Sequence, residues 1–128
     1  MTVLIIGGKY QGKTDLAKRL FNLTDDDFIN GCNLTDNNIK SAKAISDLQE
    51  YTKKIDSLNF DLHSFVNSLK DKIIICTELG CGVVPMQKEL DDWREITGRI
   101  CCEIASISDV VIRVTAGLPQ IIKGKVEF

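Results

Sequence analysis

Eight residues near the N-terminus form a complete phosphate-binding pattern. The run Gly7-Gly8-Lys9-Tyr10-Gln11-Gly12-Lys13-Thr14 matches G-x-x-x-x-G-K-[ST], between an apolar run at 3–6 and an amphipathic stretch at 15–21. Glycines let successive backbone N–H groups converge on an anion at the positive end of a helix. Lys13 can then reach the β- and γ-phosphates, and the Thr14 hydroxyl can bind Mg²⁺. The sequence therefore predicts a site for a nucleoside triphosphate and Mg²⁺.

A second candidate, Glu78, directly follows the apolar run 73–76. Phosphate-loop enzymes hold a carboxylate at such a position to orient Mg²⁺, water or an acceptor hydroxyl. We expect Glu78 to bind Mg²⁺ or to act on the acceptor. The alternative is a glutamate that only caps the loop after the strand.

The remaining sequence predicts elements that would position these residues. Strands are expected at 2–6, 72–77 and 109–114, an edge strand at 28–31, and helices at 13–22, 36–55, 60–69 and 86–106, with a break at 117–119. Unbroken apolar runs are typical of parallel strands that are buried on both faces. We expect a P-loop NTPase-like (RecA-like) α/β fold, a mostly parallel sheet flanked by helices, in a single compact domain over residues 1–128. Ligands bind at the carboxyl ends of such strands, which places the phosphate loop, Glu78 and residues 115–117 on one edge.

Composition narrows the classes of partner. The chain has 16 basic and 18 acidic residues scattered along it, a net charge of −2, and thus no basic stretch for nucleic acid. Its longest apolar runs have four residues, far below the ~20 that span a bilayer, so no membrane anchor or signal peptide is expected. Five cysteines without a C-x-x-C pair favour reduced thiols in the cytoplasm.

Three further motifs carry a family resemblance. The runs T-E-L-G-C-G-V-V-P at 77–85, W-R-E-I-T-G-R at 93–99 and A-G-L-P at 116–119, followed by Lys123, stand in this order after the phosphate loop. Together they resemble the adenosylcobinamide kinase/adenosylcobinamide-phosphate guanylyltransferase family of corrinoid salvage, over residues 3–20 and 73–123. The resemblance implies a homo-oligomeric enzyme that transfers the γ-phosphate of ATP or GTP to adenosylcobinamide in cobalamin biosynthesis. Arg94, Arg99 and Lys123 are then candidates to neutralise charge on the transferred phosphoryl group.

The chain departs from the family pattern in three places. Tyr10-Gln11 replace Arg-Ser in the loop, and Cys101-Cys102 replace Asn-Gln. The His-Arg-rich segment whose histidine takes the guanylyl group is missing, and His63 has no neighbouring arginine. We therefore expect a kinase without guanylyltransferase activity. A nucleotide-binding module that has lost catalysis, and a small P-loop kinase or NTPase with an unrelated acceptor, remain alternatives. Without a base-specific motif such as N-K-x-D, the sequence does not choose between ATP and GTP.

Overall fold

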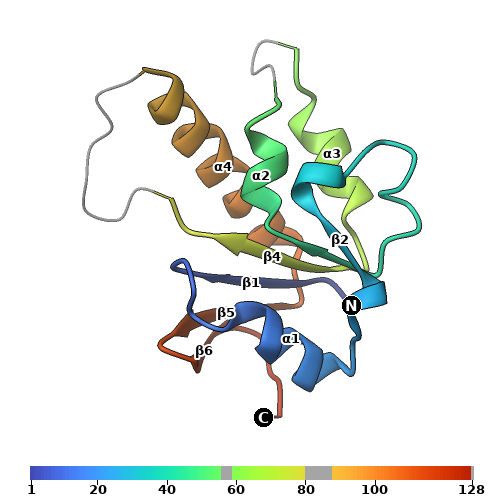
Figure 1. Ribbon diagram of the computed structural model, residues 1–128, viewed down its shortest axis with the longest axis vertical. Coiled ribbons are helices and arrows are strands. Elements are labelled where there is room, and N and C mark those ends of the chain that lie inside the picture. The colour runs from blue at the N-terminus through green and yellow to red at the C-terminus, as the bar shows by residue number, and fades with distance from the viewer. Residues whose placement is uncertain (56–58, 80–87, 128) are drawn as a thin grey trace.

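The computed structural model describes residues 1–55, 59–79 and 88–127, and these residues build one six-stranded sheet in the order β2-β3-β4-β1-β5-β6 (Figure 1). The strands are β1 Val3–Gly7, β2 Phe28–Asn30, β3 Ala44–Ser46, β4 Ile73–Thr77, β5 Val110–Thr115 and β6 Leu118–Lys123. All neighbouring pairs are parallel except β5 and β6. The predicted P-loop NTPase-like α/β fold is therefore confirmed.

Helices cover both faces of the sheet. Helix α1 (Lys13–Phe21) lies on one face, and α2 (Leu48–Thr52), α3 (Leu62–Ser68) and α4 (Lys88–Ile107) lie on the other (Figure 1). Short 3-10 helices occupy Asp25–Asp27 and Gly31–Asn33. Successive residues of β1 alternate between the two layers, because Val3 and Ile5 pack with α1 whereas Leu4 packs with the three-helix layer. This double burial explains the apolar runs of the central strands.

The predicted helix over residues 36–55 is wrong. Most of its apolar residues are buried, but the chain there forms turns, then β3, and then the short helix α2. Strand β3 pairs with β2 on one side and β4 on the other. A three-residue strand is too short to display its own period, so the spacing of the buried residues imitated a helix.

The break expected at 117–119 is a hairpin turn followed by a sixth strand. Ala116 and Gly117 both have positive φ, 51° and 76°, which is the backbone of a two-residue type I′ turn. Strand β6 then returns antiparallel along β5, with Leu118 paired to Thr115. The turn belongs to the same edge as the phosphate loop, as expected. Residues 80–85, the later part of the T-E-L-G-C-G-V-V-P motif at 77–85, lie outside the described residues.

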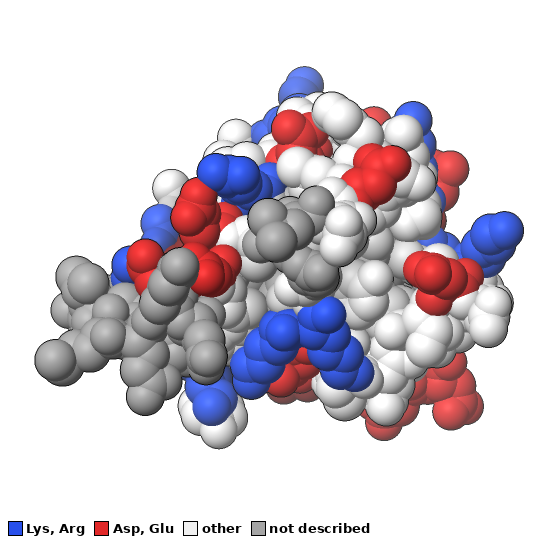
Figure 2. Space-filling view, turned by 90° about the horizontal axis from the view of Figure 1, so that it is seen from above, with Lys and Arg blue, Asp and Glu red and all other residues white. Residues whose placement is uncertain are grey.

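Figure 2 views the molecule from the side of α2, α3 and α4, where acidic and basic side chains are interspersed. Within the described part of the chain, no helix is long and apolar enough to cross a membrane.

Candidate nucleotide-binding site

The phosphate loop joins the end of β1 to the start of α1. Gly7 ends the strand where a Cβ atom would lie 2.5 Å from the Val114 carbonyl oxygen, so no side chain fits. Gly12 precedes the helix with φ 86°, a conformation that favours glycine. Between them, Lys9 and Tyr10 are exposed, and Tyr10 has a φ of 61°. Gly7 and Gly12 thus stand at the two loop positions where the backbone requires glycine.

The hairpin turn between β5 and β6 holds the loop in place. The Gly117 N–H donates to the Gln11 carbonyl oxygen at 3.0 Å, and the Ala116 N–H donates to the Gln11 side-chain oxygen. In contrast, the backbone N–H groups of residues 9–14 donate to no described residue. Such a row of available donors before a helix N-terminus suits a phosphate chain.

Lys13 is a buried cation. Its side chain is only 6% exposed, and Nζ donates to the Gly8 carbonyl oxygen at 2.6 Å. Burial lowers the pKa of Lys13 below its ordinary value, and the nearby carboxylates of Asp47 and Glu78 oppose this shift. Because desolvation disfavours the charged form, an anion bound beside Lys13 would raise its pKa again.

Lys13 opens onto a pocket of about 540 Å³, which we call the phosphate pocket. Its walls come from the phosphate loop with α1, from α2, from the end of β4 and from α4. The lining residues include Lys9, Lys13, Thr14, Asp47, Glu50, Lys53, Thr77, Leu79 and Trp93. The volume is within the range typical of small-molecule sites. Thr14, which is predicted to bind Mg²⁺, lines this pocket.

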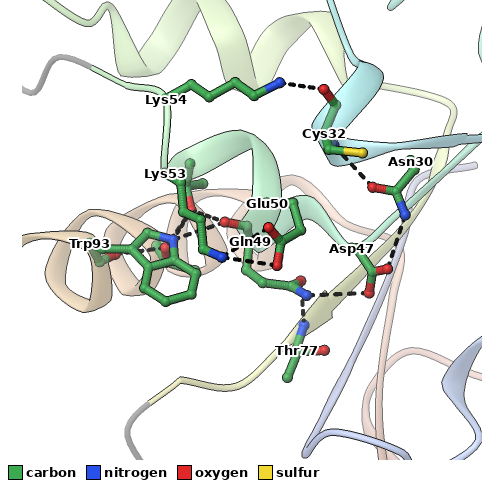
Figure 3. Close-up of polar contacts among 11 residues, drawn as sticks. Asn30, Cys32, Asp47, Gln49, Glu50, Lys53, Lys54, Thr77 and Trp93 are labelled. Carbon is green, nitrogen blue, oxygen red and sulfur yellow. Dashed lines mark hydrogen bonds and ion pairs between the residues drawn. The ribbon is translucent and has the colours of Figure 1, made fainter. Parts of the chain in front are cut away.

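Asp47 is a site residue that the sequence reasoning missed. It follows β3, has positive φ (49°), and lines the phosphate pocket together with Lys13 and Thr14. Its two carboxylate oxygens accept hydrogen bonds from Asn30 Nδ2 at 3.0 Å and Gln49 Nε2 at 3.2 Å (Figure 3). Gln49 is fixed in turn, because its Oε1 accepts from the Thr77 N–H at 3.0 Å. The signal that could have found Asp47 is the one used for Glu78, an acid directly after a buried strand.

Mg²⁺ fits these residues. The Thr14 hydroxyl and the Asp47 carboxylate are hard oxygen ligands, and Mg²⁺ is usually held by one or two protein ligands together with phosphate oxygens and water. Groups of three or more His, Cys, Asp or Glu side chains suited to a metal ion are absent from the described residues. An Mg²⁺ ion would therefore depend on the bound phosphates.

The backbone of Glu78 lies at the phosphate loop, whereas its side chain lines a neighbouring pocket. The Glu78 N–H donates to the Gly7 carbonyl oxygen at 2.8 Å, which places it beside the phosphate loop. Its Oε2 accepts a hydrogen bond from Arg113 Nη2 at 2.9 Å. Glu78 lines a second pocket of about 290 Å³, which we call the side pocket; it is formed by Ile6, Cys76, Thr77, Glu78, Leu79, Arg94, Thr97, Gly98 and Cys101.

The three predicted cations do not meet at the phosphate pocket. Arg94 lines the side pocket and forms an ion pair with Asp91 at 2.9 Å. Arg99 is exposed, pairs with Glu95 at 2.6 Å, and lines neither of the two pockets. Lys123 donates to the Ala105 and Ser106 carbonyl oxygens near the end of α4, so it stabilises that helix terminus instead.

Lys53 is a cation of the phosphate pocket that was not predicted from the sequence. It lines the phosphate pocket with Trp93, and its ammonium lies 4.5 Å from the indole centroid and 3.0 Å from a Glu50 carboxylate oxygen (Figure 3). The Trp93 Nε1 donates to the Gln49 carbonyl oxygen at 2.8 Å and to Thr52 Oγ1 at 2.9 Å. These bonds join α4 to α2 and fix the indole on which Lys53 rests.

The sheet and this pocket are those of a nucleotide-binding α/β protein. The sequence matches the family model "Cobinamide kinase / cobinamide phosphate guanyltransferase" over residues 33–122, well over half of the chain. The chain therefore belongs to this family of nucleotide-using transferases of cobalamin biosynthesis, as the sequence motifs predicted. A search of curated proteins gives no match. The phosphate loop precedes the matched range, so its assignment depends on its own sequence and geometry.

Proposed function

We propose that the protein is a kinase that transfers the γ-phosphate of ATP or GTP to the alcohol of adenosylcobinamide. The observation that carries this proposal is the shared pocket of Lys13, Thr14 and Asp47 at the carboxyl edge of the sheet, with Glu78 directly beside it. Family membership supplies the acceptor. The family description names a kinase and a guanyltransferase activity, and we assign the kinase activity to this chain.

The donor nucleotide would be held by its phosphates. The N–H groups of the loop and the Lys13 ammonium would bind β- and γ-phosphate oxygens, and Thr14 and Asp47 would hold Mg²⁺. When bound there, Mg²⁺ would supply positive charge that neutralises the charge developing during transfer. Lys53 on the same pocket wall is a further cation for that charge.

Transfer requires one bond to form and another to break. The acceptor hydroxyl oxygen would bond to the γ-phosphorus as the bond to the β,γ-bridging oxygen breaks, and the nucleoside diphosphate leaves. The hydroxyl proton must pass to a base, and the carboxylate of Glu78 is placed for it beside the phosphate loop. Its ion pair with Arg113 would hold that carboxylate in position.

A guanylyltransferase would need a histidine at the α-phosphate. The single histidine of the sequence, His63, is exposed on α3 and lines neither the phosphate pocket nor the side pocket. A covalent intermediate also needs cations around the reacting phosphate. We therefore propose that the kinase activity is present without the transferase activity.

Incubation of the purified protein with γ-labelled ATP or GTP, Mg²⁺ and adenosylcobinamide tests this function. Label is expected in the corrinoid, and intact-protein mass spectrometry after incubation with GTP is expected to show no GMP-sized adduct. An adduct that disappears in His63→Ala would contradict the second expectation. Nucleotide binding without any transfer would favour the alternative of a catalytically inactive nucleotide-binding module.

Asp47→Asn tests the assignment of the metal ligand. The amide keeps the size of the side chain but loses the charge that makes a carboxylate a Mg²⁺ ligand, so the Mg²⁺ concentration for half-maximal nucleotide binding should rise about tenfold or more. Binding of the nucleotide without Mg²⁺ should change much less. Glu50→Gln, which alters a carboxylate of the same pocket that pairs with Lys53, serves as the matched control. An unchanged Mg²⁺ requirement in Asp47→Asn would remove Asp47 from the metal site.

A further inference from the structure

Gly98 stands in the interior of α4, where glycine is unfavourable compared with alanine. Packing does not explain it, because a Cβ atom built at Gly98 would meet no atom within 4 Å. Gly98 lines the side pocket. Gly98 is exposed, so its missing side chain leaves space at a wall of that pocket that faces solvent.

The side pocket has an apolar interior with charged groups among its walls. Ile6, Leu79, Cys76 and Cys101 supply apolar or thiol surface, and Glu78 and Arg94 supply charge. Cys76 is buried and Cys101 is partly buried. An aliphatic group fits this lining better than a phosphate or a sugar does.

The side pocket adjoins the phosphate pocket, because the two share wall residues. Thr77 and Leu79, at and just after the end of β4, line both. Glu78 stands between these two residues and lines the side pocket, while its N–H bonds to the phosphate loop at Gly7. A ligand in the side pocket would therefore meet the phosphates at the carboxylate that is proposed as the base.

We propose that the side pocket is the acceptor subsite, which takes a short aliphatic arm that carries the reacting hydroxyl. This inference rests on the proposed kinase function. The volume of about 290 Å³ lies at the lower limit for a complete small-molecule site, so the arm enters while the bulk of a large acceptor stays outside. The hydroxyl then lies between Glu78, which receives its proton, and the γ-phosphoryl group held by the phosphate loop.

Gly98→Leu tests this subsite, because it adds a bulky side chain at a wall of the pocket, where the new Cβ atom would meet no atom within 4 Å. The KM for adenosylcobinamide should rise about tenfold or more, since a few misplaced methylene groups change discrimination by that order. Nucleotide affinity should stay unchanged. Cys102→Leu adds a leucine at an exposed position of the same helix outside the pocket and is the matched control. If wild type phosphorylates the corrinoid and Gly98→Leu does so with the same KM, the subsite is overturned; if wild type transfers no phosphate, the proposed kinase function fails.

Alkylation gives a second readout that needs no catalysis. Cys101 lines the side pocket, whereas its neighbour Cys102 is exposed and outside it. Adenosylcobinamide should slow the reaction of Cys101 with N-ethylmaleimide severalfold and leave Cys102 unaffected, as measured in Cys102→Ser and Cys101→Ser variants. Nucleotide alone should protect neither thiol. Equal Cys101 reactivity with and without saturating adenosylcobinamide would overturn the subsite, even if Gly98→Leu did not fold.

Discussion

Replacement of Lys13 by alanine is expected to weaken the binding of ATP or GTP by about tenfold or more. A hydrogen bond to a charged group contributes about 1.5–3 kcal/mol, and about 1.4 kcal/mol corresponds to a factor of ten in affinity. Lys13 is the buried cation of the phosphate pocket, so water does not screen its contact with phosphate as it would at an exposed lysine. Isothermal titration calorimetry with the Mg²⁺-nucleotide complex measures this difference.

The fold should survive this substitution. Burial of the Lys13 charge is unfavourable by itself, as its lowered pKa indicates, so its removal should leave the thermal midpoint close to that of wild type. Lys18→Ala is the control, because Lys18 lies on the same helix but pairs with Asp25 outside the pocket. Equal nucleotide affinity in wild type and Lys13→Ala would discard the phosphate-loop assignment.

The central part of the fold could be predicted because its signals are local. The unbroken apolar runs of β1 and β4 are buried on both faces, and Gly7 and Gly12 of the phosphate loop occupy positions at which the backbone requires glycine. Both signals lie in consecutive residues, so the strands and the phosphate loop can be predicted without knowledge of tertiary contacts. The prediction for 36–55 failed because β3 has only three residues and depends on its pairing with β2 and β4.

The same distinction separates the site residues. Thr14 and Lys13 follow from a contiguous motif, but the role of Asp47 depends on Asn30 and Gln49, which come from other elements. The arginines of α4 were proposed from motif position alone. Arg94 and Arg99 turned out to pair with acids on their own helix, whereas Lys53 reaches the pocket through a contact with a ring 40 positions further along the sequence. The contact between Lys53 and Trp93 is set by tertiary packing and leaves no local pattern.

Replacement of Glu78 by glutamine is expected to lower turnover at least about a hundredfold, while nucleotide affinity changes by less than about twofold. General-base catalysis contributes about 10²–10⁴ to a rate, and the amide cannot accept the hydroxyl proton. Its oxygen can still accept the hydrogen bond that Arg113 donates to Glu78, so the geometry should remain. Single-turnover rates with saturating nucleotide and adenosylcobinamide measure the chemical step separately from binding.

The Arg113→Met variant distinguishes a catalytic role of Glu78 from a purely structural one, because it removes the ion-pair partner and leaves the Glu78 carboxylate. If Glu78 accepts the proton, Arg113→Met should lose less turnover than Glu78→Gln, since the carboxylate is still present to act as the base although the partner that positions it is gone. If the pair only stabilises the end of β4, the two variants should lose turnover and thermal stability to the same extent. Undiminished turnover in Glu78→Gln would return this residue to the role of a loop cap, and the proton would then have to leave by another route.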